Sequence, residues 1–298
     1  MAIESLAALT EAGKHEDLFD VIVRSDCVER GVTPGESIAQ MTALYAAIRR
    51  AKAGYDPALR SRSGMVGGDG AKMRAYAASG KTICGEYIGT VLAQALEMGE
   101  SNACMKCIVA APTAGSCGVL PAVLLPYQAR EGLDDAAMVR AMYVAGAIGQ
   151  VIAQRASIAG AAGGCQAEIG TASAMGAAAL CYLAGGSAEA VCHAAALAIK
   201  SLLGLVCDPV AGLVEVPCVK RNAAGAMIAM SSADLALAGI RSAVPPDEVV
   251  GAMREVGDRM DVSLRETGRG GVAATPFGQA VSEKMSGQAG SAPASGVR

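Results

Sequence analysis

Three of the ten cysteines in this 298-residue sequence stand in segments broken by glycine or proline. Cys207 and Cys218 each lie close to a proline, and Cys165 follows two glycines. Glycine and proline keep a thiolate out of regular structure, where a metal can bind it. The residues alone leave a metal site and a set of buried structural thiols equally open. Three thiolates would also fit zinc, although catalytic zinc prefers histidine and the chain has only two histidines.

The other cysteines give weaker signals. Cys104 and Cys107 form a CxxC pair, which is typical of thioredoxin-like and zinc sites, but neither a second pair nor a strand accompanies it. Together with Cys117 they make a second compact set of three thiols, and spacing alone does not exclude it. The cysteines in apolar, helix-like surroundings are interpreted as buried packing residues: Cys27, Cys181 and Cys192.

Glu168 is a further candidate for chemistry. It and Glu189 are the only charged residues over 156–199, and the first turn of a helix explains Glu189. A carboxylate in such an apolar stretch must be paired, linked to a metal or protonated. A salt bridge to Arg155 or Lys200 is as compatible with the sequence as a catalytic role.

The elements that position these residues are predicted to be helices. Helix-forming Ala, Leu, Met, Glu and Lys are abundant, and alternating β-branched or aromatic runs are scarce. Helix starts are predicted at the capping box Thr33–Glu36, at 186–189 and at Pro246, where an apolar stripe follows. Residues 54–70, 110–118 and 204–218 are rich in Gly and Pro and are predicted to be loops.

We therefore predict an all-α fold, a helical bundle whose buried Gly/Pro-rich loops carry the three cysteines. Residues 1–283 are expected to form a single helical catalytic domain. Residues 284–298 include the low-complexity stretch SGQAGSAPASGVR and are expected to be a disordered tail.

Composition excludes several classes of function. The chain has 25 Lys and Arg against 28 Asp and Glu, a net charge of -3, only 3% aromatic residues and no Trp, so we expect no nucleic-acid binding. The apolar stretches are interrupted by polar residues such as Gln150 and Gln154, so we expect no membrane span. The N-terminus does not resemble an export signal, which predicts a cytoplasmic protein with reduced thiols. A charged fraction of only 18% indicates that another chain covers some surface.

Five segments together resemble the alpha subunit of the iron–sulfur-dependent L-serine dehydratases. They are SGKT (79–82), ESNACMKCIVAAPTAGSCGVLP (100–121), AGGCQAEIGTASAMGAA (162–178), GLVCDPVAGLVEVPCVKRNA (204–223) and RETGRGGVAATP (265–276). The resemblance implies an all-helical catalytic domain that converts L-serine to pyruvate and ammonia. It places a [4Fe–4S] cluster on Cys165, Cys207 and Cys218, with one iron left open to act as a Lewis acid on the substrate hydroxyl.

The same resemblance assigns expected roles to other residues. Substrate binding is expected at Ser79, Lys81, Thr82, Asn102, Thr113 and Gly115. Glu168 and His193 are the candidates for the catalytic base, which a partner subunit could also supply. Resemblance to an alpha subunit further implies a separate beta subunit and an oligomeric enzyme.

Two other classes of function stay open at this point. A pyridoxal-phosphate serine or threonine dehydratase would need an α/β fold and a Schiff-base lysine beside a phosphate loop, and only SGKT (79–82) resembles part of such a loop. A helical scaffold or thiol sensor, without enzyme activity, would bind a partner through its apolar surface.

Overall fold

Helices make up the regular secondary structure of residues 3–289, the part of the chain that the computed structural model describes. No β-strand occurs in this range, and one isolated bridge joins Cys207 to Arg265, so the predicted all-α fold is confirmed. The α-helices are α1 (Leu6–Ala12), α2 (Leu18–Arg30), α3 (Pro34–Ala53), α4 (Asp69–Ala78), α5 (Gly85–Ala103), α6 (Val119–Glu131), α7 (Asp135–Arg155), α8 (Gly160–Gly163), α9 (Thr171–Leu183), α10 (Ala188–Leu202), α11 (Cys218–Leu237), α12 (Pro246–Arg259) and α13 (Pro276–Ala289). Short turns of other helix types are η1 (Gln166–Gly170), η2 (Val210–Gly212), η3 (Val262–Leu264) and η4 (Gly271–Ala274).

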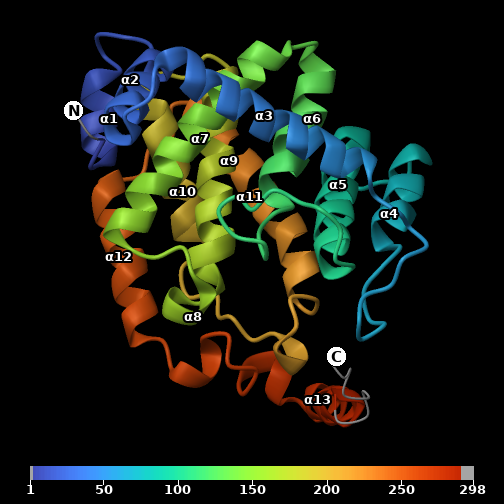
Figure 1. Cartoon of the computed structure of the whole chain (residues 1–298). Helices are drawn as coiled ribbons and strands as arrows, with labels where there is room; N and C mark the ends of the chain where they lie inside the picture. Colours follow the sequence, from blue (N-terminus) through green and yellow to red (C-terminus); the bar gives the residue numbers. More distant parts are fainter. Residues whose placement is uncertain (1–2, 290–298) are drawn as a thin grey trace, which may run out of the picture.

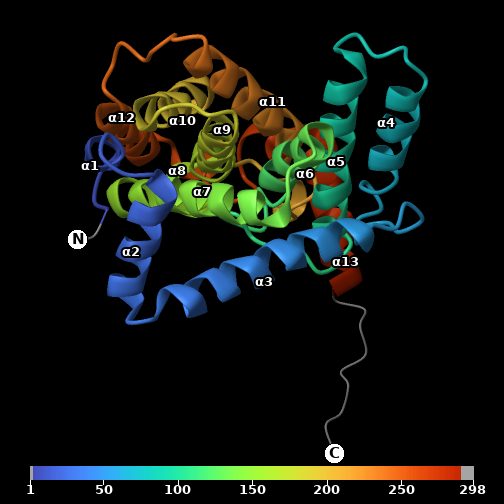
Figure 2. The same cartoon turned by 90° about the horizontal axis from the view of Figure 1, so that it is seen from above.

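Helix α9 is the centre of the bundle. Helices α6, α7, α10 and α11 pack around it, as both views show (Figures 1 and 2). Residues 171–181 are buried without a break, the pattern of a helix that is enclosed on every side. Its small residues allow close approach: a methyl group on Gly176 would lie 3.2 Å from both Ala229 and Val123. The core therefore depends on small side chains and dense packing.

Helix α7 is the one helix in residues 3–289 that is long and apolar enough to cross a membrane by length and composition. However, 67% of its most apolar window is buried inside the protein. Its apolar surface therefore faces other helices, as expected of a core helix.

The predicted helix starts are confirmed. Thr33 and Glu36 form the reciprocal capping box of α3, and Pro34 is the first residue of that helix. Ser187 accepts a hydrogen bond from the backbone N–H of Ala190 and so caps α10. Helix α12 begins at Pro246, as predicted.

Helix α4 was not predicted as a separate element. It packs along α5, where a methyl group on Gly70 would lie only 2.6 Å from the Glu97 side chain. The guanidinium of Arg74 donates two hydrogen bonds to the buried Glu97 carboxylate, at 2.5 and 2.6 Å. Arg74 therefore neutralises this buried acid.

The polar loop 54–68 is fastened to the rest of the protein by two buried carboxylates. The Ser61 hydroxyl donates to Glu215 Oε2 at 2.6 Å. The Tyr55 hydroxyl donates to Glu100 Oε2 at the same distance. Because Glu215 lies three residues before Cys218, the loop helps to fix the segment that carries this cysteine.

The expected tail boundary at 284 falls within helix α13. Helix α13 continues to Ala289, and Met285 is buried on one side of it. Residues 284–289 contain Lys, Met, Gln and Ala, which are good helix formers, and their propensity outweighs the Ser and Gly between them. The rest of the predicted tail, 290–298, lies outside the described residues.

Candidate active site

The three predicted ligand cysteines come together from three separate segments. Cys165 directly precedes η1, Cys207 lies in the bridge to Arg265, and Cys218 is the first residue of α11. All three are buried, and Cys165 and Cys207 belong to one small apolar cluster. A negative charge on Cys165 would raise the pKa of both Cys207 and Cys218, which indicates that the three thiols lie close to one another.

Local backbone geometry explains how Cys165 reaches this position. Gly164 has a φ of 75°, which favours glycine, and a methyl group there would lie 2.5 Å from the Met260 sulfur. The chain can therefore turn sharply between α8 and η1. This is the structural role of the glycines that precede Cys165 in the sequence.

The electrostatics of the three thiols suit a positively charged metal group. Burial raises the pKa of Cys165 to about 11 and that of Cys218 to about 12, and it raises the pKa of Cys207 as well. Free thiols in this environment are protonated at neutral pH. A bound metal stabilises the thiolate form and so compensates for the burial.

The arrangement of the three thiols is compatible with an iron–sulfur cluster. In residues 3–289, no group of three or more His, Cys, Asp or Glu side chains is placed to hold one metal ion. In an iron–sulfur cluster each thiolate binds a different iron, so the ligands surround a volume and need not converge on one point. Three neighbouring buried thiols fit that requirement.

The Glu168 carboxyl lies beside these cysteines. The Thr113 hydroxyl donates to its Oε1 at 2.7 Å, and the Cys207 sulfur is 3.9 Å from its Oε2. Burial raises the pKa of Glu168, the charge of Glu266 adds to this rise, and the hydrogen bond from Thr113 opposes it. Arg155 instead pairs with Asp247 at 3.4 Å. Among the described residues neither Arg155 nor Lys200 forms an ion pair with Glu168, so the salt-bridge interpretation of Glu168 is wrong.

Two glycines line the space around this carboxyl. A methyl group on Gly115 would lie 3.2 Å from Glu168 Oε1. A methyl group on Gly160 would lie 2.8 Å from Glu168 Oε2 and 3.0 Å from the Cys207 sulfur. Of the predicted substrate-binding residues, Thr113 and Gly115 are thus brought together with Glu168 and the cysteines.

Asn222, which the sequence analysis did not identify as a site residue, holds the Thr113–Gly118 loop against α11 by hydrogen bonds. Its side-chain carbonyl accepts the backbone N–H of Gly118 at 2.8 Å, and its amide donates to the carbonyls of Gly115 and Cys218 at 2.8 and 3.0 Å. The side chain is 1% exposed, so water cannot replace these bonds. One residue therefore couples the predicted substrate loop to a predicted cluster ligand.

Replacement of Asn222 by alanine should destabilise the protein by about 3 kcal/mol, because two buried backbone groups and one half-buried carbonyl lose their partner. Denaturant unfolding measures the change. The matched control is Asn102→Ala, at a half-buried position in the last turn of α5, which should change stability by less than about 1 kcal/mol. Equal effects of the two substitutions would contradict the proposed fastening role.

Three of the predicted substrate-binding residues lie elsewhere. Ser79, Lys81 and Thr82 connect α4 to the N-terminal end of α5, where the side chain of Thr82 lies near Gly89. Loop residues 113–118 lie against the C-terminal half of α5, since Gly118 approaches the carbonyl of Ala95. Gly89 and Ala95 are six residues apart, a rise of about 9 Å along the helix axis, so the two groups lie at different levels of α5. Their role in substrate binding, and that of Asn102, stays a prediction.

His193 contacts Ser242 and Glu189. Its Nδ1 accepts the backbone N–H of Ser242 at 3.2 Å, and its Nε2 is 3.9 Å from Glu189. Burial lowers the pKa of His193, which favours the neutral ring that this hydrogen bond requires. The contacts give His193 a structural task on α10, and its role as a base stays a prediction.

The three cysteines of the competing set, Cys104, Cys107 and Cys117, differ in how far they are buried. Cys107 is exposed, Cys104 is half-buried, and Cys117 is fully buried with its thiol directed to the carbonyl of Met98 at 3.7 Å. Burial raises the pKa of Cys117 to about 12. The structure thus gives these three thiols different surroundings.

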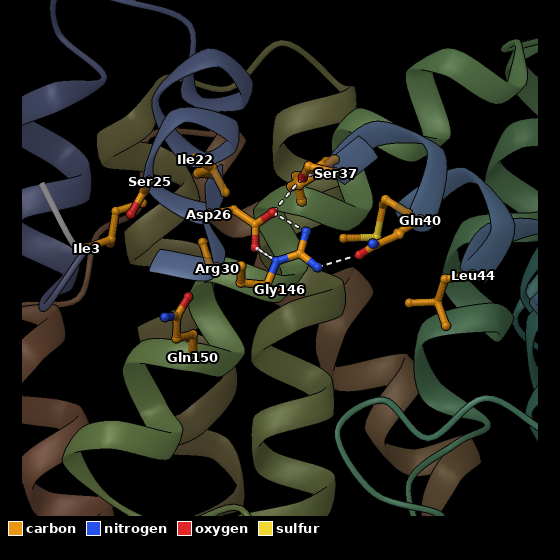
Figure 3. Close-up of a pocket in the computed structure, with 13 residues that line it drawn as sticks. Ile3, Ile22, Ser25, Asp26, Arg30, Ser37, Gln40, Leu44, Gly146 and Gln150 are labelled. Atoms are coloured by element: carbon orange, nitrogen blue, oxygen red, sulfur yellow. Dashed lines mark hydrogen bonds and ion pairs between the residues drawn. The ribbon is translucent and has the colours of Figure 1, made fainter. Parts of the chain in front are cut away.

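A separate hollow of about 420 Å³ lies between α2, α3 and α7, and Figure 3 shows the residues that line it. Arg30 donates to both carboxylate oxygens of Asp26, at 2.8 and 2.6 Å, and also contacts Gln40. Ser37 bridges Asp26 and Tyr143. These polar groups hydrogen-bond to one another. We therefore interpret the network as a structural one that holds α2 and α3 against α7. None of the predicted site residues lines this hollow.

Comparison with known proteins places the chain in a family. The family model described as serine dehydratase alpha chain matches residues 7–273. The chain is 49% identical over 287 residues to a probable L-serine dehydratase alpha chain of Bacillus subtilis, covering 94% of each protein. It is 50% identical over 217 residues to an L-serine dehydratase alpha chain of Peptoniphilus asaccharolyticus, covering 73% of this chain and 74% of that one. In the L-serine dehydratase TdcG of Escherichia coli, 45% identity extends over 183 residues, 60% of this chain and 40% of the longer relative. The chain therefore belongs to the serine dehydratase alpha chain family.

Proposed function

We propose that this chain is the cluster-carrying subunit of an iron–sulfur-dependent L-serine dehydratase, which converts L-serine to pyruvate and ammonia. The relatives named L-serine dehydratase support the lyase activity and the substrate. The observation that carries the cofactor proposal is the set of three buried thiols beside the Glu168 carboxyl. The pyridoxal-phosphate alternative required an α/β fold, and the all-α fold does not meet that requirement.

In this proposal Cys165, Cys207 and Cys218 would hold a [4Fe–4S] cluster. When bound through three thiolates, such a cluster supplies one iron without a protein ligand, which is a Lewis acid for the hydroxyl of serine. Hydroxide is a poor leaving group, and this assistance lowers the barrier to its departure. The protein residues then have to orient the substrate and move its α-proton.

The proposed base is Glu168. The Thr113 hydroxyl, by donating to Oε1, fixes the carboxyl and leaves Oε2 on the side of Cys207. Glu168 takes up the α-proton as the hydroxyl departs, and the departing hydroxide then takes this proton from Glu168 to form water. Serine is thereby converted to aminoacrylate, and Glu168 returns to its starting state. Aminoacrylate tautomerises to an imine, and one water hydrolyses the imine to pyruvate and ammonia. One water is released and one is consumed, so the reaction balances as L-serine to pyruvate plus ammonia.

Exposure to air tests the cofactor proposal. A site with an iron open to solvent is sensitive to oxidants, so we expect dehydratase activity to decay in air as the iron is lost. Anaerobic incubation with ferrous iron and a thiol should restore it. The measurement is pyruvate formation together with iron per chain, and activity that persists through prolonged aeration in an iron-free sample would contradict the proposal.

A further prediction concerns a partner subunit. We also propose that the enzyme works in the cytoplasm, where the reducing environment keeps cysteines as thiols. Two relatives are named alpha chains, and apolar side chains such as Met105 and Phe277 are 91% and 65% exposed. We expect low activity or poor solubility of this chain alone and recovery when a beta chain is co-expressed to form an oligomer. Pyruvate formation and light scattering with and without the beta chain measure this. Full turnover by the isolated monomer would contradict it.

A further inference from the structure

Arg221 lies where the three cysteine segments meet. It is on α11, three residues after Cys218, and its side chain is only 17% exposed. Its Nη1 donates to the carbonyl of Val206 at 2.7 Å, the peptide group that leads directly into Cys207. One side chain therefore connects the segment of Cys218 to the segment of Cys207.

The other arm of the guanidinium pairs with Asp208. Its Nη2 lies 2.8 Å from Asp208 Oδ1, and the Asp208 side chain is 3% exposed. The second carboxylate oxygen, Oδ2, accepts the backbone N–H of Val272 at 2.8 Å. A methyl group on Gly271 would lie 2.2 Å from the same oxygen, so only glycine allows this approach. The pair thus extends to the segment 265–272, which also forms the bridge to Cys207.

The third cysteine is also within reach of Arg221. The guanidinium is close enough to the Cys165 thiol for a side-chain hydrogen bond. Three thiolates in a buried site need compensating positive charge, and Arg221 is a cation placed among them.

We propose that Arg221 is a positioning residue for the metal cluster, which holds the segments of Cys165, Cys207 and Cys218 in register and compensates the charge of their thiolates. The inference rests on the proposed cofactor and adds a residue outside the ligand set. Arginine suits the task because its planar fork binds a carbonyl and a carboxylate at once, whereas lysine is a point charge. Outer-shell partners of metal ligands typically contribute 10–100-fold to metal affinity.

The test compares Arg221→Gln, Arg221→Lys and the matched control Lys220→Gln. Lys220 is the neighbouring cation on α11, but it is 71% exposed and pairs with Asp69 at 3.4 Å. Each protein, reconstituted anaerobically with iron and sulfide, is mixed with an iron chelator, and the rate of iron release is followed by absorbance. The midpoint reduction potential of the cluster is measured in the same samples.

Iron release from Arg221→Gln is expected to be 10–100-fold faster than from the wild type. Its potential should become more negative, because loss of a nearby positive charge disfavours the reduced, more negative cluster. Arg221→Lys should keep most of the potential but release iron at an intermediate rate. Lys220→Gln should match the wild type in both.

Release from Arg221→Gln within twofold of the wild-type rate would overturn the inference. If circular dichroism shows that Arg221→Gln is unfolded, Arg221→Lys decides: faster release supports the role and a wild-type rate overturns it. A wild-type chain that takes up no iron would instead refute the proposed cofactor, and this inference with it. The wild-type iron content therefore separates the two failures.

Discussion

Replacement of Cys165, Cys207 or Cys218 by serine is expected to abolish iron binding and dehydratase activity together. Serine lacks the soft thiolate that iron requires, and three ligands cannot spare one. The activity loss should exceed about 100-fold. Even the loss of a residue that only hydrogen-bonds to a metal ligand lowers metal affinity or activity about 10–100-fold. Iron and sulfide per chain after anaerobic reconstitution, and pyruvate formation from L-serine, measure both effects.

The matched controls are the cysteines of the CxxC pair. Cys107 is exposed and Cys104 half-buried, so serine at either position should preserve iron and activity, with a change in stability of about 1 kcal/mol or less. Cys117→Ser is a third control, because this thiol is as buried as the predicted ligands. It should lower stability and keep the iron. The ligand assignment is wrong if Cys104→Ser and Cys107→Ser remove the iron while Cys165→Ser retains it.

The sequence predicted those features of the fold that depend on local chemistry. The capping box at Thr33–Glu36 and the start at Pro246 are determined by side chains within one helical turn, so they can be recognised without tertiary information. The loops at 110–118 and 204–218 follow from Gly and Pro in the same way. In the site, Gly and Pro also marked the three cysteines, which the structure brings together.

The features that sequence reasoning missed depend on tertiary contacts. Arg221 and Asn222 look like ordinary polar residues of a helix, and only the approach of distant backbone carbonyls gives them a role. Ser79–Thr82 show the opposite case. Their motif does not show which part of α5 it lies against, and only the structure places Thr82 near Gly89 and loop 113–118 near Ala95. One sequence feature does point to Arg221. It follows Cys218 by three residues, about one helical turn, so the two side chains lie on the same face of the helix.

Replacement of Glu168 by glutamine is expected to lower kcat about 10²–10⁴-fold, the typical contribution of a positioned general base. Glutamine has nearly the same shape and still accepts the hydrogen bond of Thr113, but its amide cannot take up the α-proton. The iron content should stay at the wild-type level because Glu168 is not a proposed ligand. Steady-state pyruvate kinetics and iron analysis on the same samples measure both quantities.

His193→Asn separates the two candidate bases. The Nδ1 of His193 is occupied by the N–H of Ser242, and asparagine can offer an oxygen to the same donor, so kcat should fall less than about tenfold. Exchange of the α-proton with deuterated solvent gives an independent readout. A protein in which Glu168→Gln loses turnover but retains exchange would show that another group, on this chain or its partner, removes the proton. A large loss of kcat in His193→Asn with normal turnover in Glu168→Gln would reverse the assignment.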